Sequence, residues 1–319
     1  MQSSPVTGRL APSPTGHLHL GHALSFLLAW WRARSQGGRL LLRLEDLDVE
    51  RASAEHADAA VRDLEWLGLD WDGPVRLQSR ERERIVEAAE RLADAGRAYA
   101  CVCSRGDLRA LGAPQAGQDE VPYPGTCRGR FTSVAQAEQA TGKTAGLRFR
   151  VPSGPLAFHD ENYGPRAYDV AAEVGDFLIL RRNKMPSYQL SVVVDDHFDG
   201  VNEIVRGSDL LPSTSRQLAL GRALGFATPR YFHAPLLCDE QGKRLAKREA
   251  ALGLGELRAA GVDPRAIVAF VARALGQADA ERAERLTPRE WLPAFNATAV
   301  GTEPIRLTTR ALDELRRAR

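Results

Sequence analysis

The first 44 residues constrain the fold more than any other part of the chain, because they alternate a strand, a helix and a second strand. Residues 6–10 are predicted to form a short strand, which ends at the proline-rich residues 11–16. Residues 22–34 have the apolar spacing of a helix that ends at Gly37 and Gly38, and residues 39–44 predict the second strand. This order favours an α/β fold with a parallel sheet of Rossmann type and ligands at the strand ends.

The rest of the chain indicates that this sheet is split in sequence. The patterns predict helices over residues 53–67, 80–95 and 213–224, and strands over 147–151, 177–181 and 231–238. The β-branched run LSVVVD at 190–195 is expected to be a strand that resumes the parallel sheet. The domains expected are 1–98 (catalytic domain, first half), 99–185 (a Gly- and Pro-rich insertion), 186–248 (catalytic domain, second half) and 249–319 (a helical C-terminal region).

Composition excludes several functional classes. The 43 basic and 41 acidic residues leave a net charge of only +2, so any nucleic-acid contact must be a local patch. The longest apolar stretch, residues 23–31, is too short to span a bilayer, and the N-terminus has no secretion signal, so a cytoplasmic protein is expected. Four cysteines in 319 residues are expected to be thiols or metal ligands rather than a disulfide framework.

Residues 12–22, PSPTGHLHLGH, form a proline-constrained turn that leads into the first predicted helix. The turn places His19, Gly21 and His22 at the helix start, where backbone N–H groups and the helix dipole favour a phosphate. Glycine permits close approach, and the two imidazoles can donate hydrogen bonds to phosphate oxygens. Taken alone, a pair of histidines fits a plain polar turn better.

A second motif, GKRLAKR at residues 242–248, follows the last predicted strand. It holds Lys243 and Lys247, two of only four lysines in the chain, beside Arg244 and Arg248. Such a loop could hold a triphosphate and stabilise the charge that develops as it reacts. By itself, a solvated run of charges is the commoner explanation.

Together the two motifs resemble the signatures of the class I aminoacyl-tRNA synthetases. Residues 19–22, HLGH, look like the HIGH signature, and residues 244–248, RLAKR, look like KMSKS with Lys247 at its fourth position. Arg244 replaces a lysine and Ala246 a serine, so a hydroxyl contact is lost there. Residues 12–23, 43–48 (RLEDLD), 186–197 (PSYQLSVVVDDH) and 205–211 (VRGSDLL) resemble the glutamyl branch.

Within that branch the chain resembles the short glutamyl-Q tRNA(Asp) synthetase family, because roughly seventy residues follow Lys247 and leave no room for anticodon-binding domains. The resemblance implies a monomeric ligase that uses ATP with Mg²⁺ to convert L-glutamate into glutamyl-adenylate. Glutamate would then pass to queuosine in the anticodon arm of tRNA(Asp). The ATP site implied is His19, Gly21, His22, Arg244 and Lys247, of which His19, His22 and Lys247 would be catalytic.

The charges of glutamate define what its pocket must contain. Two carboxylates and an ammonium need fixed cations, a fixed anion and hydroxyls. Glu45 is expected at the ammonium, and either Arg9 or Arg206 at the side-chain carboxylate, although any one of them alone could be an ordinary ion pair. The glutamate-binding residues that the resemblance implies are Arg9, Leu10, Ala11, Pro12, Ser13, Glu45, Tyr188 and Arg206.

Cys101, Cys103 and Cys127 form a cluster that suits zinc, but a tetrahedral site needs a fourth ligand. The resemblance implies one zinc ion per chain, bound by Cys101, Cys103, Tyr123 and Cys127, within an acceptor-binding insertion. His159, Asp119 and Glu120 are alternative ligands, and free buried thiols are an alternative to any metal site. Cys238 is expected to pack in the core.

Three other functions compete with the synthetase interpretation. One is a glutamyl-tRNA synthetase catalytic fragment that charges the 3′ end of tRNA(Glu). Another is a non-catalytic RNA- or zinc-binding paralogue, which would not need the intact HLGH motif and Lys247. The third, an NAD-dependent dehydrogenase, is disfavoured because no G-x-G-x-x-G follows the first strand.

Overall fold

The computed structural model describes residues 5–110, 122–243, 253–277 and 285–318. Two sheets form its centre, one of strands β1-β2-β3 and one of strands β7-β6-β10-β9. They meet where β9 runs beside β1, because the Asn202 N–H donates to the Thr7 carbonyl (3.0 Å) and the Thr7 N–H donates to Asn202 Oδ1 (2.9 Å). The strands are β1 (Thr7–Leu10), β2 (Arg39–Leu44), β3 (Arg76–Leu77), β6 (Leu156–Asp160), β7 (Gly164–Tyr168), β9 (Glu203–Gly207) and β10 (Arg230–Ala234). All the pairings are parallel except that of β6 with β7.

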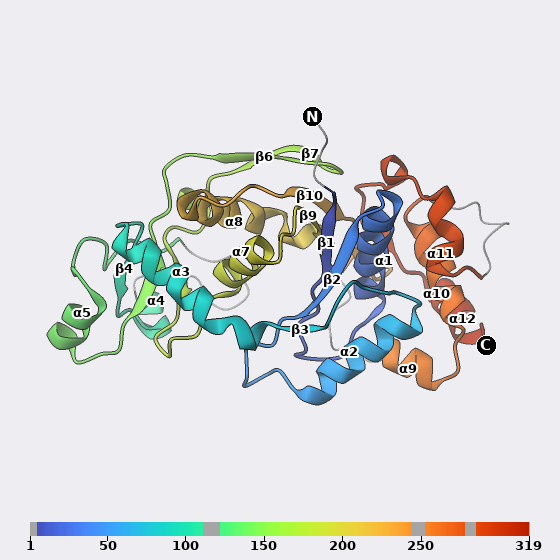
Figure 1. The fold of residues 1–319 in the computed structure, drawn as a ribbon, viewed down its shortest axis with the longest axis horizontal. Helices are drawn as coiled ribbons and strands as arrows, with labels where there is room; N and C mark the ends of the chain where they lie inside the picture. The colour runs from blue at the N-terminus through green and yellow to red at the C-terminus, as the bar shows by residue number, and fades with distance from the viewer. Residues whose placement is uncertain (1–4, 111–121, 244–252, 278–284, 319) are drawn as a thin grey trace.

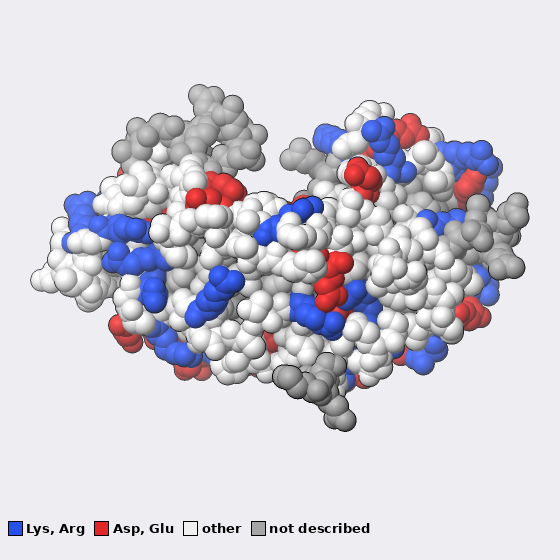
Figure 2. All heavy atoms as spheres, turned by 90° about the horizontal axis from the view of Figure 1, so that it is seen from above, with Lys and Arg blue, Asp and Glu red and all other residues white. Residues whose placement is uncertain are grey.

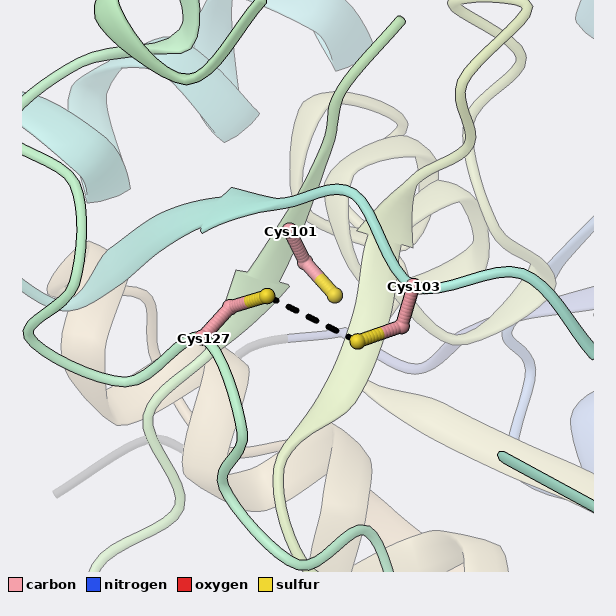
Figure 3. A group of neighbouring side chains, drawn as sticks. All are labelled: Cys101, Cys103 and Cys127. Carbon is pink, nitrogen blue, oxygen red and sulfur yellow. Dashed lines mark hydrogen bonds between the residues drawn. The ribbon is translucent and has the colours of Figure 1, made fainter. Parts of the chain in front are cut away.

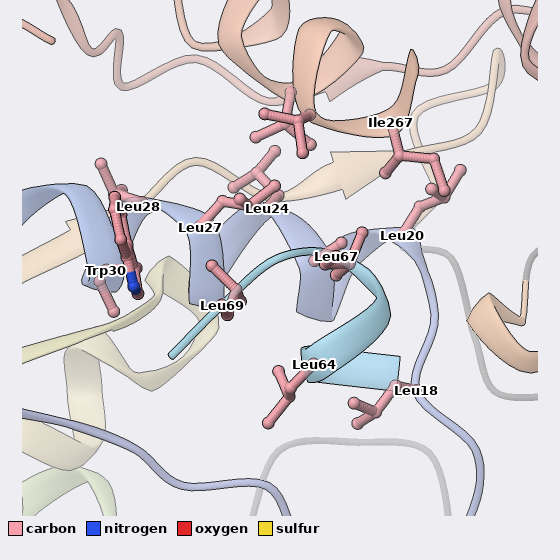
Figure 4. Close-up of a cluster of buried hydrophobic side chains, with 14 of the residues drawn as sticks. Leu18, Leu20, Leu24, Leu27, Leu28, Trp30, Leu64, Leu67, Leu69 and Ile267 are labelled. Atoms are coloured by element: carbon pink, nitrogen blue, oxygen red, sulfur yellow. The ribbon is translucent and has the colours of Figure 1, made fainter. Parts of the chain in front are cut away.

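Helix α1 (Leu20–Ser35) packs along β1, β2 and β9 and is the centre of the largest hydrophobic cluster. Figure 4 shows Leu24, Leu27 and Leu28 of α1 among side chains from the segment that follows α2 and from α10. Burial of these leucines stabilises the fold by about 2 kcal/mol each. The packing fixes the start of α1 relative to the strand ends, which is where the HLGH motif lies.

The other helices cover this core on both sides (Figure 1). Ser53 caps α2 by accepting a hydrogen bond from the His56 N–H (3.1 Å). The helices are α2 (Ala54–Trp66), α3 (Arg82–Asp94), α8 (Leu211–Leu224), α9 (Leu254–Ala259), α10 (Pro264–Ala274), α11 (Pro288–Trp291) and α12 (Thr309–Arg317). Short 3₁₀ turns are η1 (Gln78–Glu81), η2 (Ser208–Leu210), η4 (Leu292–Ala294) and η5 (Ala297–Ala299). β11 (Leu237–Cys238) pairs in parallel with β12 (Ile305–Arg306). Among the described residues, no helix is long and apolar enough to cross a bilayer.

A smaller antiparallel sheet lies at the end of the molecule opposite the C-terminal helices (Figure 1). It consists of β4 (Ala98–Cys101), β5 (Gly146–Phe149) and β8 (Phe177–Leu180), with α4 (Arg105–Ala110), α5 (Val134–Thr141) and α6 (Val170–Glu173) as its helices. We call this part, residues 98–110, 122–149 and 170–180, the cysteine module. The β6–β7 hairpin also lies in the range 99–185, yet it extends the central sheet beside β10.

The expected strand at 190–195 is wrong, because these residues lie inside helix α7 (Tyr188–Phe198). Ser187 caps the helix by accepting from the Leu190 N–H (3.5 Å), and Leu190 and Val194 share one buried face. Their spacing of four residues is helical, so tertiary packing overrides the β preference of the valines. The helix also directs Asp195 and Asp196 toward buried arginines, as described below.

Candidate active site

A cavity of about 340 Å³ opens where β1, β2, β9 and β10 end and α1 begins. Ligands are expected at this edge of a parallel sheet. Of the predicted site residues, ten line the cavity: Arg9, Ala11, Pro12, Ser13, His19, Gly21, His22, Glu45, Tyr188 and Arg206. Leu10 does not, because its side chain is fully buried in the hydrophobic cluster around α1.

The HLGH motif forms a reciprocal cap at the start of α1. His19 Nδ1 accepts from the Gly21 N–H (3.1 Å), and His22 Nδ1 accepts from the His19 N–H (3.1 Å). Because both Nδ1 atoms accept, each neutral imidazole carries its proton on Nε2. The rings lie with centroids 3.9 Å apart. The first turn of α1 has no acidic residue, so this helix start is suited to an anion.

The second motif falls largely outside the described residues. Arg244 and Lys247 belong to residues 244–252, and their predicted contacts remain predictions. The residues that follow pack against the first motif, because Gly253 forms a β-bridge with His19 and the Leu254 N–H donates to the Leu18 carbonyl (2.8 Å). The chain beyond the second motif is therefore attached to the turn that carries the first.

One wall of the cavity rests on a network of buried ion pairs centred on Arg43. This guanidinium donates to Glu45 Oε1 (3.3 Å), Asp196 Oδ1 (2.8 Å) and Asp199 Oδ2 (3.0 Å). Arg9 donates to the same Asp196 oxygen (3.3 Å) and to the Val205 carbonyl (3.1 Å). Although burial opposes it, the surrounding carboxylates, Asp196 first among them, raise the pKa of Arg43. We call this side of the cavity the Arg9 wall.

A second wall of the cavity holds Arg206 by neutral acceptors. Its guanidinium donates to Gln217 Oε1 (2.7 Å), Thr214 Oγ1 (2.8 Å) and His233 Nε2 (3.1 Å). The ring of Tyr231 lies 5.5 Å from the guanidinium carbon. Since none of these four partners is a carboxylate, the positive charge of Arg206 is not compensated by them. We call this side the Arg206 wall.

The cavity is also lined by two carboxylate side chains, Glu45 and Asp209, and by the hydroxyls of Ser13, Ser25 and Tyr188. Glu45 follows the end of β2 and accepts from the Ser13 hydroxyl (3.5 Å). Burial raises the pKa of Glu45, and Arg43 and Arg9 only partly oppose this. Tyr188 is the first residue of α7 and lines the same cavity. The arrangement therefore offers two cations, two carboxylates and hydroxyls to a small zwitterionic ligand.

Cys101, Cys103 and Cys127 come together in the cysteine module (Figure 3). Their Sγ atoms lie within 4.8 Å of one another, and those of Cys103 and Cys127 are 3.6 Å apart. Four thiolates at about 2.3 Å around a tetrahedral zinc ion would lie about 3.8 Å apart, so this spacing fits a metal site. The Tyr123 hydroxyl lies 3.5 Å from the Sγ atoms of both Cys101 and Cys103.

The other candidate ligands are not part of this cluster. His159 is exposed on β6 in the central sheet, and Cys238 is buried on β11, as expected. Asp119 and Glu120 lie outside the described residues. Arg148, which the sequence did not single out, donates to Cys101 Sγ (3.2 Å) and stacks 3.7 Å from the centroid of the Tyr123 ring.

Several other residues of the site were not predicted. Asp196 and Arg43 lie in the motifs VVVDDH and RLEDLD, whose acidic and basic residues were a usable signal. Thr214, Gln217 and His233 are single polar residues on a buried helix and a buried strand, and nothing local marks them.

Comparisons with known proteins agree with this geometry. The family model of the class I tRNA synthetases (E and Q), catalytic domain, matches residues 5–314. The chain therefore belongs to the class I tRNA synthetases of the E and Q type. It is 44% identical to the glutamyl-Q tRNA(Asp) synthetase of Symbiobacterium thermophilum over 97% of this chain and 98% of that one. This places it, more particularly, in the glutamyl-Q tRNA(Asp) synthetase family.

A second relative and a solved structure are similar along nearly the whole chain. The glutamyl-Q tRNA(Asp) synthetase of Nitratidesulfovibrio vulgaris is 41% identical over 98% of both chains. The crystal structure of a glutamate tRNA ligase from Elizabethkingia meningosepticum, in complex with its amino acid, superposes with a TM-score of 0.81 at 25% identity. This structural match covers 97% of this chain and 68% of the ligase chain.

Proposed function

We propose that this protein is a ligase that activates L-glutamate with ATP and transfers it to queuosine in the anticodon of tRNA(Asp). The observation that carries the proposal is one cavity lined by both the HLGH turn and the charged residues that glutamate requires. The names of the relatives supply the acceptor, since they are glutamyl-Q tRNA(Asp) synthetases.

In this proposal each charged group of glutamate binds a different residue of the cavity. Glu45 attracts the ammonium, and Arg206 binds the side-chain carboxylate, because its charge is not already compensated by a carboxylate partner. Arg9, which lines the same cavity, supports it from the Arg9 wall. A neutral amide in place of that carboxylate would leave a buried cation uncompensated, so glutamine should be rejected.

The first chemical step joins the α-carboxylate of glutamate to the α-phosphorus of ATP. The new P–O bond forms as the bond to the β-phosphate breaks and pyrophosphate leaves. The Nε2–H groups of His19 and His22 and the N-terminus of α1 stabilise the phosphate oxygens, with Lys247 on the leaving pyrophosphate. Mg²⁺ bound with ATP would neutralise part of the phosphate charge. A hydroxyl of the RNA then attacks the acyl carbon, and AMP leaves.

The RNA reaches the cavity along a surface of mixed charge. Figure 2 shows basic side chains spread over this face, including the end of the molecule that carries the cysteine module, on the left in Figures 1 and 2. Phosphate contacts at this end would position the anticodon arm without reading its sequence. This agrees with a net charge of only +2 for the whole chain.

Radiolabelled glutamate and four RNAs test the proposal. Labelling is expected with queuosine-containing tRNA(Asp), and also after removal of its 3′-terminal adenosine. Queuosine-free transcripts of tRNA(Asp) and tRNA(Glu) should remain unlabelled. Labelling that depends on the 3′ end and ignores queuosine would refute the acceptor. Glutamate-dependent ATP–pyrophosphate exchange tests activation separately, and Lys247→Ala should abolish most of that exchange.

We further propose that the cysteine module binds one zinc ion through Cys101, Cys103, Cys127 and Tyr123. The Sγ spacing and the cation at Arg148 suit a cluster of thiolates. Purified protein should contain about one zinc per chain. Cys103→Ser should lose it, whereas the control Cys238→Ser should retain it. A protein without metal, whose three thiols titrate freely, would overturn this site.

A further inference from the structure

Behind Arg206 lies a chain of buried polar groups that crosses β10 and reaches strand β6. His233 is the cross-strand neighbour of Arg206 in the pairing of β9 with β10. Its Nε2 atom lies 3.1 Å from Arg206 Nε, and its Nδ1 atom lies 2.6 Å from Asp160 Oδ2. Arg206 is 6% exposed, and His233 and Asp160 are fully buried. The function proposed above assigns no role to either of these last two residues.

Hydrogen-bond chemistry fixes the protonation of this chain. Arg206 can only donate, so His233 Nε2 must accept and carry no proton. The remaining proton of the imidazole then lies on Nδ1, where Asp160 accepts it. Burial lowers the pKa of His233, which keeps the ring neutral. The hydrogen bond from His233 and those from the Tyr163 and His233 N–H groups lower the pKa of Asp160, against the effect of burial, which keeps it ionised.

We propose that His233 and Asp160 are positioning residues for substrate specificity, which hold the guanidinium of Arg206 in the orientation that binds the side-chain carboxylate of the amino acid. This inference rests on the proposed glutamate site. Asp160 selects the tautomer of His233, and His233 in turn gives Arg206 an acceptor that adds no negative charge. A carboxylate at position 233 would instead compete with the substrate for Arg206.

The environment of Asp160 makes this role testable by a single-atom change. Its other oxygen, Oδ1, accepts from the N–H groups of Asn162 (3.1 Å), Tyr163 (2.8 Å) and His233 (3.3 Å). In Asp160→Asn the amide must place its oxygen toward these donors, so its NH₂ group faces His233 Nδ1. The imidazole proton then moves to Nε2. There it faces the N–H donor of Arg206, so the hydrogen bond between the two side chains is lost.

The experiment measures kcat and the KM for glutamate and for ATP in ATP–pyrophosphate exchange. Asp160→Asn and His233→Leu are each expected to raise the KM for glutamate about 10- to 100-fold, the effect of losing a hydrogen bond to a charged group. The KM for ATP should be unchanged. His233→Gln retains an acceptor for Arg206 and should recover most of the loss. His159→Leu, an exposed substitution next to Asp160 on β6, is the matched control and should behave like the wild type.

Calorimetric titration of glutamate into the same proteins separates two kinds of failure. If the wild type neither binds glutamate nor exchanges pyrophosphate, the proposed function itself is wrong. If the wild type binds glutamate and Asp160→Asn binds it equally well, the positioning role is overturned. A parallel loss of glutamate and ATP binding in Asp160→Asn would also overturn it, because a general structural role predicts that result. If His233→Leu does not fold, Asp160→Asn alone still decides the test.

Discussion

The two walls of the cavity hold their arginines in opposite ways. On the Arg9 wall, Arg43 and Arg9 share the carboxylate of Asp196, and Arg43 also contacts Glu45 and Asp199. On the Arg206 wall, the guanidinium is held by an amide, a hydroxyl and an imidazole. Both arginines are buried to a similar degree, 5% exposed for Arg9 and 6% for Arg206. Burial alone therefore does not tell a structural cation from a binding one.

The difference lies in where the counter-charge comes from. A buried cation that already has carboxylate partners helps to stabilise the fold, because removing it leaves those carboxylates buried and unpaired. A buried cation with neutral partners destabilises the folded state because its charge is not compensated. A bound anionic ligand supplies that compensation. We infer that the Arg9 wall sustains the shape of the cavity, whereas the Arg206 wall provides much of its affinity for an anion.

Arg43→Met should give the largest effect, and it should be on stability. The substitution leaves three buried carboxylates without their shared cation, which costs about 3–5 kcal/mol. Urea denaturation followed by circular dichroism measures the free energy of unfolding. Arg310→Met, which removes an exposed partner of Glu314 (2.8 Å), is the control and should change it by less than about 1 kcal/mol. An equally small change in Arg43→Met would mean that the network does not sustain the fold.

Arg206→Met should show the reverse pattern. The KM for glutamate should rise about 30- to 4000-fold, the range expected for a desolvated charge pair of about 2–5 kcal/mol. The free energy of unfolding should fall far less than in Arg43→Met, because the lost hydrogen bonds are offset by removal of an uncompensated charge. Arg206→Lys tests geometry, since it keeps the charge but loses the planar fork. A large loss of stability with unchanged KM would reverse the assignment of the two walls.

Arg9→Met should fall between these extremes, because Arg9 contacts Asp196 and also lines the cavity. We expect a KM for glutamate about 10-fold higher and a loss of about 1–2 kcal/mol in the free energy of unfolding. Exchange kinetics and urea denaturation on the same preparation check both. If only the KM for glutamate changes, Arg9 serves binding alone. If only the free energy of unfolding changes, Arg9 serves stability alone.

The sequence predicted the cavity residues near the strand ends well, but it did not predict the buried residues that hold them in place. Arg9 and Arg206 are each the last residue but one of a strand and Glu45 follows a strand, so a correct parallel sheet brings them to one edge. His233 and Asp160 meet only through the pairing of β10 with β6, across 73 positions of sequence, and no local pattern marks such a contact. The valines at 192–194 misled the prediction for the same reason, because the helical face of α7 is defined by packing partners far away in the chain.

The smallest effect concerns the pH dependence of glutamate binding, and it tests Glu45, a member of the Arg43 network that also lines the cavity. Burial raises the pKa of Glu45, so its proton is lost at a higher pH than that of an ordinary glutamate. Below that pKa the neutral acid no longer attracts the substrate ammonium, and the KM for glutamate should rise as the pH falls. The contribution to stability has the opposite sign, because the folded state holds this proton more tightly and loses that advantage as the pH rises. Exchange measured across the acid range, with Glu45→Gln as the reference, should therefore show a KM that falls with pH only in the wild type. A profile equally flat in both proteins would remove Glu45 from contact with the ammonium.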